Sequence, residues 1–334
     1  MKKQILFIAI IIAVLLTSFW EWHWRAAGYR PYHDDSNDLW AIWRRQVPDL
    51  KEDEVLIIGS SRAHFDLNIY EWEKLTGSRP IMLASGGMSP APLLKELAEN
   101  TDFKSILFVG VAPDLFFGTE KDGGWRRKQE RMDFAKKETY AQRLNQSIFM
   151  QIDPHFAYIN ENLQLKGLVE WLPVPQRDSV HPPMFWPDMS VSDANRNLEM
   201  IPEMESDTVM QNAYKKIWAS WGWEKPDSTK RDTVINNYAT WAKTIEGRGG
   251  KVIFFRAPAT GTYRDYENEA FPREKYWDVL LERSACKGFH FEDYPQLNTF
   301  VCPEWSHLLA KDATVYTQEF VKILQAQGQL KTKN

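Results

Sequence analysis

Short apolar runs alternate with amphipathic segments in this chain, and that alternation limits its fold more than any other feature of the sequence. The first three runs lie at residues 54–58, 81–84 and 105–111, and helical patterns at 66–77 and 90–100 separate them. Buried strands joined by helices are typical of a parallel sheet that is covered on both faces. We therefore expect an α/β fold, a three-layer α/β/α domain with a mostly parallel, doubly wound sheet.

The alternation stops near residue 119 and resumes near residue 229. A highly charged segment at 119–131 precedes a predicted long amphipathic helix at 132–150, and six prolines follow between 171 and 202. Such a proline-rich stretch is typical of a lid or a binding insertion. The resumed pattern predicts further helices and strands, namely helices at 229–246, 272–284 and 306–326 and strands at 252–255 and 288–291. One domain over 52–330 with a large helical or irregular insertion at about 119–228 fits better than two tandem domains.

The N-terminus carries an apolar run long enough to approach a membrane span. The run covers residues 5–20, and Trp20, Trp22 and Trp24 follow where a signal peptide would have small residues for cleavage. Indole rings collect at the membrane–water interface. We expect residues 1–24 to be an uncleaved membrane anchor, with a cleaved signal peptide as the alternative.

The charges beside this run predict its orientation. Lys2 and Lys3 precede it, and basic residues favour the cytoplasmic side of a membrane. We therefore expect a single pass through the cytoplasmic (inner) membrane, with the N-terminus inside and the remaining chain extracytoplasmic, in the periplasm. Residues 25–51 are expected to form a stalk with a short helix at about 39–45.

Composition narrows the range of ligands. The 334 residues carry a net charge of −4 from 41 basic and 45 acidic side chains, so no basic field attracts nucleic acid. The chain has two cysteines, too few for a four-thiolate zinc site. Its histidines show no metal-like spacing, which concerns His64, His155, His181 and His290. We expect no metal, no cofactor and no nucleic-acid partner.

Residues suited to catalysis lie at three places, two where a strand ends and one where the last helix begins. Ser60 and Ser61 follow the first strand, glycines at 86–87 follow the second, and Glu304 precedes His307 by three residues near the last helix. A serine, a histidine and a carboxylate are the parts of a nucleophilic triad. Each has an ordinary alternative: the serine can cap a helix, the glutamate can favour a helix start, and the histidine can be a satisfied structural residue.

The same positions resemble a known superfamily. Residues 57–61 (IIGSS), 82–87 (MLASGG) and 304–308 (EWSHL) look like the first, second and closing blocks of the SGNH, or GDSL-type, hydrolases. The variant is most similar to the anchored extracytoplasmic branch that includes alginate O-acetyltransferases and the D-alanine transfer proteins of teichoic acid. The resemblance covers about 54–115 and 250–325 and leaves the insertion unexplained.

The resemblance implies a role for each matching residue. Ser61 would be the nucleophile, with Ser60 as a substitute, His307 the general base and Glu304 the residue that orients it. The backbone N–H groups of Ser61 and Gly87 would form the oxyanion hole. The sequence departs from the pattern because the orienting residue is usually aspartate and because residues 109–114 (VGVAPD) lack the usual asparagine. Loss of one such donor costs about 2.7–4 kcal/mol of transition-state stabilisation, although the D-alanine transfer branch lacks it too.

Further candidates lie around these blocks. Arg62 could bind an anionic substrate or pair with Asp66, Asp114 could line the pocket or cap a turn, and Trp305 lies within the closing block. The tryptophans at 218, 221 and 223 could stack on sugars, but their spacing favours a core stripe. In an extracytoplasmic domain, Cys286 and Cys302 could form a disulfide that closes a loop of about 16 residues and contributes roughly 3 kcal/mol.

These features lead to two functional hypotheses. The first is a membrane-anchored serine enzyme, an esterase-type hydrolase or an O-acetyltransferase, that acts on acyl esters of an envelope or extracellular polysaccharide through an acyl-enzyme on Ser61. A membrane partner protein could deliver the acyl donor. The second is a catalytically silent SGNH-like module that binds glycan or scaffolds an envelope complex.

Overall fold

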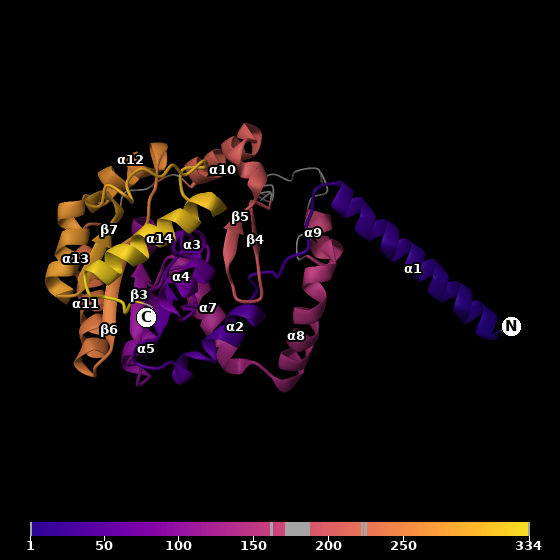
Figure 1. The fold of residues 1–334 in the computed structure, drawn as a ribbon, viewed down its shortest axis with the longest axis horizontal. Coiled ribbons are helices and arrows are strands. Elements are labelled where there is room, and N and C mark those ends of the chain that lie inside the picture. Colours follow the sequence, from indigo (N-terminus) through magenta and orange to yellow (C-terminus); the bar gives the residue numbers. More distant parts are fainter. Residues whose placement is uncertain (1, 161–162, 171–187, 222, 224–225, 333–334) are drawn as a thin grey trace.

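A five-stranded parallel sheet forms the centre of the molecule (Figure 1). The computed structural model describes residues 2–160, 163–170, 188–221, 223 and 226–332. The strands are β1 (Val55–Ile58), β2 (Ile81–Met82), β3 (Ile106–Gly110), β6 (Lys251–Arg256) and β7 (Lys287–His290), and their order is β2-β1-β3-β6-β7. All four neighbouring pairs are parallel. The expected α/β fold with a mostly parallel sheet is confirmed.

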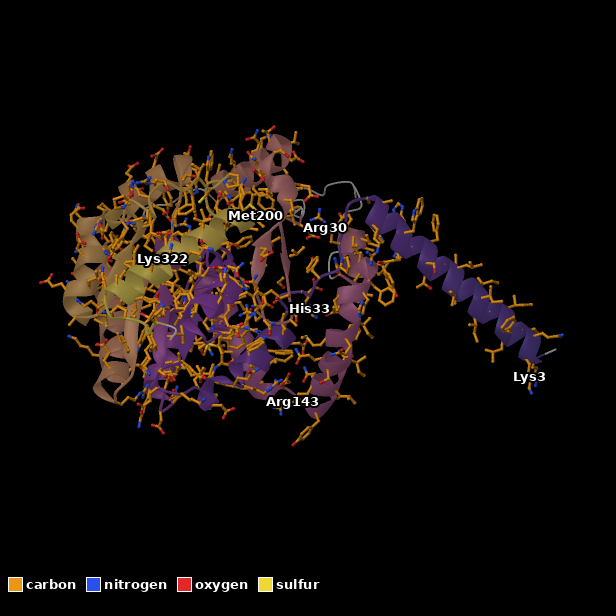
Figure 2. The ribbon with its side chains drawn as sticks, in the orientation of Figure 1. Lys3, Arg30, His33, Arg143, Met200 and Lys322 are labelled. Carbon is orange, nitrogen blue, oxygen red and sulfur yellow. The ribbon has the colours of Figure 1, made fainter. Side chains whose placement is uncertain are left out.

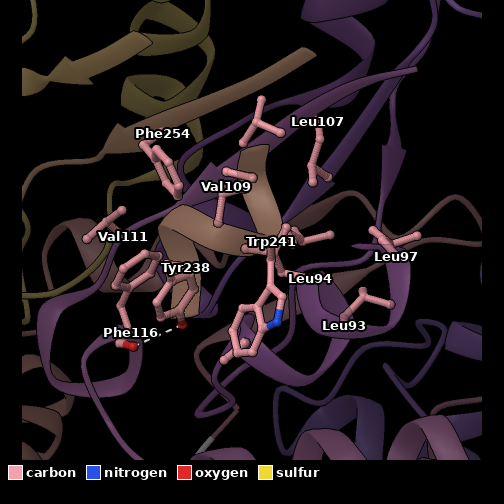
Figure 3. Close-up of a cluster of buried hydrophobic side chains, with 14 of the residues drawn as sticks. Leu93, Leu94, Leu97, Leu107, Val109, Val111, Phe116, Tyr238, Trp241 and Phe254 are labelled. Atoms are coloured by element: carbon pink, nitrogen blue, oxygen red, sulfur yellow. Dashed lines mark hydrogen bonds between the residues drawn. The ribbon is translucent and has the colours of Figure 1, made fainter. Parts of the chain in front are cut away.

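Helices cover both faces of this sheet, because side chains alternate between the faces along each strand. Ile58 and Val109 lie in one apolar cluster, whereas their neighbours Ile57 and Phe108 lie in another on the opposite face. The first cluster is completed by α5 (Ala91–Glu99), α11 (Arg231–Gly247) and α13 (Trp277–Ser284), and the second by α4 (Ile69–Thr76) and α14 (Ala310–Ala326). Figure 3 shows part of the first cluster, where the Tyr238 hydroxyl donates to the Phe116 carbonyl at 2.9 Å.

The strand order places a topological switch next to β1. The chain passes from β1 to β2 on one side and then to β3 on the other side of β1. Ligands of doubly wound sheets bind at the carboxyl ends of the strands at such a point. Gly59, directly after β1, must be glycine because a Cβ there would lie 2.6 Å from the Ala63 Cβ and 3.2 Å from the Gly110 Cα.

Capping residues set where two expected helices begin. The helix expected at 66–77 is α4, which starts where the Asn68 side chain accepts from the N–H groups of Tyr70 and Glu71; a further short helix, α3 (Ser61–Phe65), precedes it. The long helix expected at 132–150 was wrong. It is α7 (Gly123–Lys137) and then α8 (Tyr140–Ile152), because Thr139 and Gln142 form a capping box that starts a new helix.

The first fifty residues divide into a projecting helix and a part of the core. The helix α1 (Lys2–Ala26) has a mean hydropathy of 2.2 over its most apolar 18 residues and extends away from the globular part (Figure 1). It is long and apolar enough for a single membrane span, and a signal sequence would meet the same criterion. The expected stalk is wrong for its second half, because Trp40 of α2 (Asn37–Arg44) is fully buried and donates to the Leu83 carbonyl at 3.2 Å.

The insertion contains both helices and a small antiparallel ribbon. Residues 171–187 of the proline-rich stretch lie outside the described residues, whereas 188–202 contain both strands of the ribbon and lead into a short 3-10 helix. The elements of the insertion beyond α8 are η2 (Asp153–His155), η3 (Ala157–Ile159), α9 (Leu165–Glu170), β4 (Ser190–Ser192), β5 (Leu198–Met200), η5 (Pro202–Glu205) and α10 (Thr208–Ser220). The remaining short elements are η1 (Val47–Asp49), α6 (Pro113–Phe116), α12 (Gly261–Ala270), η6 (Arg273–Lys275) and η7 (Phe291–Asp293).

The expected disulfide is wrong. Cys286 and Cys302 are both free and buried. Cys286 packs into the cluster that contains Leu56 and Ile58, and Cys302 packs into the cluster on the opposite face of the sheet. The sheet therefore separates the two thiols.

Removal of the Trp40 side chain should test whether α2 belongs to the core. We expect Trp40→Ala to lower the free energy of unfolding by about 3–5 kcal/mol, because a fully buried ring is replaced by a cavity. The measurement is urea unfolding in detergent followed by circular dichroism. Trp22→Ala is the control, since that ring is 63% exposed on α1. A loss below about 1 kcal/mol for Trp40→Ala would contradict the assignment.

Candidate active site

Ser61 is the first residue of α3, at the carboxyl end of β1. The residue at the N-cap is Ser60, whose side chain makes no capping hydrogen bond. Ser61 is half-buried, whereas Ser60 is only 2% exposed. The hydroxyl of Ser61 is therefore not used as the cap of α3, and Ser61 is the more accessible of the two serines.

The loop after β2 lies directly beside the loop that carries Ser61. The Ser85 N–H donates to the Gly59 carbonyl at 3.1 Å. Two residues further, Gly87 has a φ of +63°, which side-chain-bearing residues rarely adopt, and its carbonyl accepts from Arg127. The two expected oxyanion donors, the N–H groups of Ser61 and Gly87, thus belong to adjacent loops.

The closing loop (residues 302–309) contacts α3 from the other side. The terminal helix α14 begins at Ala310 rather than at 306, so His307 lies on this loop. The Leu308 N–H donates to Asp66 Oδ1 at 3.0 Å, and the rings of Phe65 and His307 lie 4.4 Å apart between centroids. The serine and histidine blocks, far apart in the sequence, are thereby packed together.

Glu304 and His307 form a buried pair. Their exposed fractions are 0% and 1%, and Glu304 Oε1 lies 3.2 Å from His307 Nδ1. The same oxygen accepts from the backbone N–H groups of Ser306 and His307. With Nδ1 as the donor to this carboxylate, the other ring nitrogen, Nε2, is left as a proton acceptor.

His307 Nε2 is buried and has no hydrogen-bond partner in the described part of the chain. The hydrogen bond that a triad would form between Nε2 and the Ser61 hydroxyl is therefore not made in this structure. Catalytic hydrogen bonds are often loose without substrate and tighten when substrate binds. The orientation of the ring is nevertheless fixed, because Phe65 packs against it and the Trp218 ring lies 5.9 Å away.

Trp218 is a site residue that the sequence pattern did not identify as such. It lies on α10, in the insertion, and its indole N–H donates to Glu304 Oε2 at 2.6 Å. The tryptophans at 218, 221 and 223 were expected to form a core stripe. Trp218 is buried, at 6% exposure, whereas Trp221 is 42% exposed and does not lie in the core. A partner 86 residues away leaves no local spacing signal. The only signal is general: a buried indole N–H requires an acceptor.

Arg62 is committed to a buried ion pair rather than to Asp66. Its guanidinium lies 2.8 Å from Glu267 on α12 and also donates to the Ser306 hydroxyl at 3.3 Å. A second arginine, Arg256, contacts the same carboxylate at 3.2 Å. The expected pairing with Asp66 was wrong, and Arg62 instead ties the start of α3 to α12 and to the closing loop.

The other two candidate substrate residues both contact α12. Asp114 is half-buried and accepts from the Tyr263 hydroxyl at 2.7 Å, and burial, together with the charge of Glu267, raises its pKa. Trp305 is half-buried with a φ of +83°. Its ring packs closely on Gly261: a Cβ added to Gly261 would lie 2.5 Å from the Trp305 ring. Their contact with substrate stays a prediction.

The histidines outside the closing loop have separate surroundings. Burial, followed by the charge of Arg196, lowers the pKa of His64 to about 3, and burial, followed by Arg256, lowers that of His290 to about 2. His155 is exposed, and His181 lies outside the described residues. No group of three or more His, Cys, Asp or Glu side chains that could hold a metal ion occurs among the residues that the structure describes.

Removal of the Trp218 N–H should destabilise the folded protein even when an aromatic ring is kept at this position. Trp218→Phe keeps an aromatic ring but leaves Glu304 Oε2 without its donor. We expect the free energy of unfolding to fall by about 1–3 kcal/mol, the cost of an unsatisfied buried polar group. Trp125→Phe is the matched control, because that ring lies beside Trp241 rather than against a carboxylate. Equal losses in the two variants, measured by urea unfolding, would contradict a specific role for the Trp218 N–H.

Asp66 should make stability depend on pH. The side chain is fully buried and one of its oxygens lacks a partner within the described residues, and burial raises its pKa well above the usual range. The folded chain then retains a proton that the unfolded chain loses above about pH 4, so the contribution of Asp66 to stability falls as pH rises through this window. We expect Asp66→Asn to lose less stability than wild type between pH 5 and pH 8 in urea unfolding.

The control for this comparison is Asp278→Asn, whose side chain is 51% exposed. Its change in stability between pH 5 and pH 8 should match that of wild type. If Asp66→Asn also matches wild type across this range, Asp66 is ionised in the folded protein and the assignment is wrong.

Comparison with known proteins leaves the family of this chain open. No protein-family model matches the sequence. No curated protein matches it at a significant level. The function is therefore inferred from the geometry of its own residues and from the resemblance of the three sequence blocks.

Proposed function

We propose that this chain is a membrane-anchored, SGNH-type serine enzyme that moves or removes acyl groups, acetyl foremost, on an envelope or extracellular polysaccharide. The observation that carries the proposal is the buried pair of Glu304 and His307, with a hydrogen bond of 3.2 Å on the Nδ1 side and a free Nε2 on the other. This pair packs against α3, the helix that begins with Ser61.

The free Nε2 of His307 is what a general base requires. Buried polar atoms are almost always hydrogen-bonded, and leaving one unsatisfied costs about 1–3 kcal/mol. A histidine retained only for packing or capping would gain by satisfying both nitrogens. A general base must keep one nitrogen free to take a proton from the nucleophile.

The geometry supports a two-step acyl transfer. As Ser61 Oγ attacks the carbonyl carbon of the donor ester, His307 Nε2 takes the hydroxyl proton, and the Glu304 carboxylate stabilises the imidazolium. The N–H groups of Ser61 and Gly87 bind the oxyanion. Collapse of the tetrahedral intermediate breaks the ester C–O bond, and the leaving alcohol takes the proton from Nε2. A sugar hydroxyl or water then gives its proton to Nε2 and attacks the acyl carbon; the bond from this carbon to Ser61 Oγ breaks, and Oγ takes the proton back from Nε2.

The membrane arrangement completes the proposal. With Lys2 and Lys3 in the cytoplasm and α1 across the inner membrane, the domain would lie in the periplasm, where the polysaccharide acceptor is found. A membrane partner protein would deliver the acyl donor to Ser61. Plain hydrolysis of the acyl-enzyme requires no partner.

The test is covalent labelling of Ser61. Wild-type protein should react with a fluorophosphonate probe and should release nitrophenol from its acetyl ester, while Ser61→Ala should lose at least about 100-fold of both. His307→Gln should behave like Ser61→Ala. Ser60→Ala is the matched control and should retain labelling. Labelling that survives in Ser61→Ala would contradict the assignment of the nucleophile.

A second candidate function is a silent glycan-binding or scaffold module. One observation favours it: residues 109–114 contain no asparagine for the oxyanion hole. An absence of labelling and turnover in wild type, together with polysaccharide binding that is unchanged in Ser61→Ala, would support this function against the enzyme.

A further inference from the structure

One face of α8 exposes three large apolar side chains. Tyr140, Leu144 and Ile148 are 89%, 65% and 50% exposed, and their spacing of four residues places them in one stripe along the helix. Gln146, which is 5% exposed, lies on the opposite side of the helix. Since α8 packs against α2, the apolar stripe points away from the core.

The exposed apolar surface continues beyond α8. Phe156 after η2 and Leu165 and Val169 of α9 are between 39% and 78% exposed. Exposed apolar patches on soluble proteins are rarely large, and a contiguous one marks a contact with a membrane or another protein. These residues, which we call the α8–α9 face, are Tyr140, Leu144, Ile148, Phe156, Leu165 and Val169.

The α8–α9 face is fixed beside the apolar helix α1. The Glu21 carboxylate accepts from the N–H groups of Ala157 and Tyr158 at 3.0 and 3.1 Å. The Arg25 guanidinium donates to the His155 carbonyl at 2.9 Å. These bonds hold the segment after α8 against the last turns of α1. In Figure 1, α8 and α9 form the side of the globular part that looks toward α1.

We propose that the α8–α9 face lies in the interface of the same bilayer that α1 enters, so that α8 is an in-plane amphipathic helix. Trp20 and Trp22 of α1 lie within one turn of Glu21, and tryptophans at the end of a span mark the headgroup level. The contacts of Glu21 therefore bring the end of α8 to the depth at which interfacial helices lie.

The charges around the helix fit a lipid surface. The α8 sequence YAQRLNQSIFMQI contains no acidic residue and one arginine, Arg143, which pairs with the buried Glu138 at 3.0 Å. Lys136 and Lys137 end the preceding helix, α7; Lys136 pairs with Glu96 at 3.1 Å, and the structure gives no ion pair for Lys137 within the described residues. Basic residues beside an apolar stripe attract anionic headgroups, and acidic residues would be repelled by them. A protein partner would need no such absence of acidic side chains.

This contact would hold the domain at two points, α1 and α8, and so restrict its orientation over the membrane. The inference requires α1 to be present, and it does not depend on the chemistry of Ser61. A result against acyl transfer would therefore leave the membrane contact of the α8–α9 face unaffected.

The experiment measures the depth of labels in the full chain reconstituted alone in nanodiscs of zwitterionic and anionic lipid. An environment-sensitive fluorophore is attached at Leu144→Cys, with Trp22→Cys on α1 as the positive control. Lys322→Cys on α14 is the negative control, far from α1 in Figure 2. The native thiols are buried, at 7% and 1% exposure, and should not react. We expect lipids that carry a nitroxide quencher to reduce the fluorescence at 144 about twofold or more, and not at 322.

A charge placed on the stripe tests specificity. Leu144→Asp should abolish quenching of a label at Ile148→Cys, because a carboxylate is expelled from the interface. Val209→Asp is the matched control, since Val209 is also an exposed apolar residue, at 79%, but lies on α10. Circular dichroism should show both variants folded.

Two results would overturn the proposal. The first is quenching at position 22 with none at position 144, which would leave the α8–α9 face in water. The second is protection of position 144 only when a second protein is added, or crosslinks at 144 between two copies, which would identify a protein contact.

Discussion

The carboxylate of Glu304 is the interaction on which the candidate site depends. It is fully buried, and four donors reach it: two backbone N–H groups of the closing loop, the imidazole of His307 and the indole of Trp218. A buried charge is tolerated only when it is satisfied in this way. Because those donors come from the closing loop and from α10, the carboxylate joins the sheet domain to its insertion and sets the tautomer of His307.

The insertion is therefore part of the site and not an appendage to it. Trp218 lies in a small cluster with Met204 and Tyr214 from the insertion and Phe65 from α3, and Phe65 packs on the His307 ring. A second constraint acts from the other side, where Arg62, next to Ser61, is held by Glu267 on α12. The serine loop and the histidine are thus fixed by separate interactions.

Much of the fold could be predicted from the sequence, because strands of a parallel sheet are continuous apolar runs. The expected strand at 105–111 is β3 (Ile106–Gly110), and the expected serine, glycine and histidine blocks lie on adjacent loops. The break between α7 and α8 was missed because Thr139, a capping residue, fits the same periodicity as a helix interior. The disulfide failed because linear spacing carries no information on which face of the sheet a thiol occupies.

The sequence by itself determined the succession of strands and helices along the chain, the apolar helix at its start and the pairing of Glu304 with His307. Each of these depends on neighbours within a few residues. Only the tertiary structure decided that Trp218 completes the carboxylate, that Arg62 pairs with Glu267, and that α2 belongs to the core. Each of these contacts joins residues far apart in the chain. Their partners are chosen by burial, which requires every polar group removed from water to find a donor or acceptor within reach.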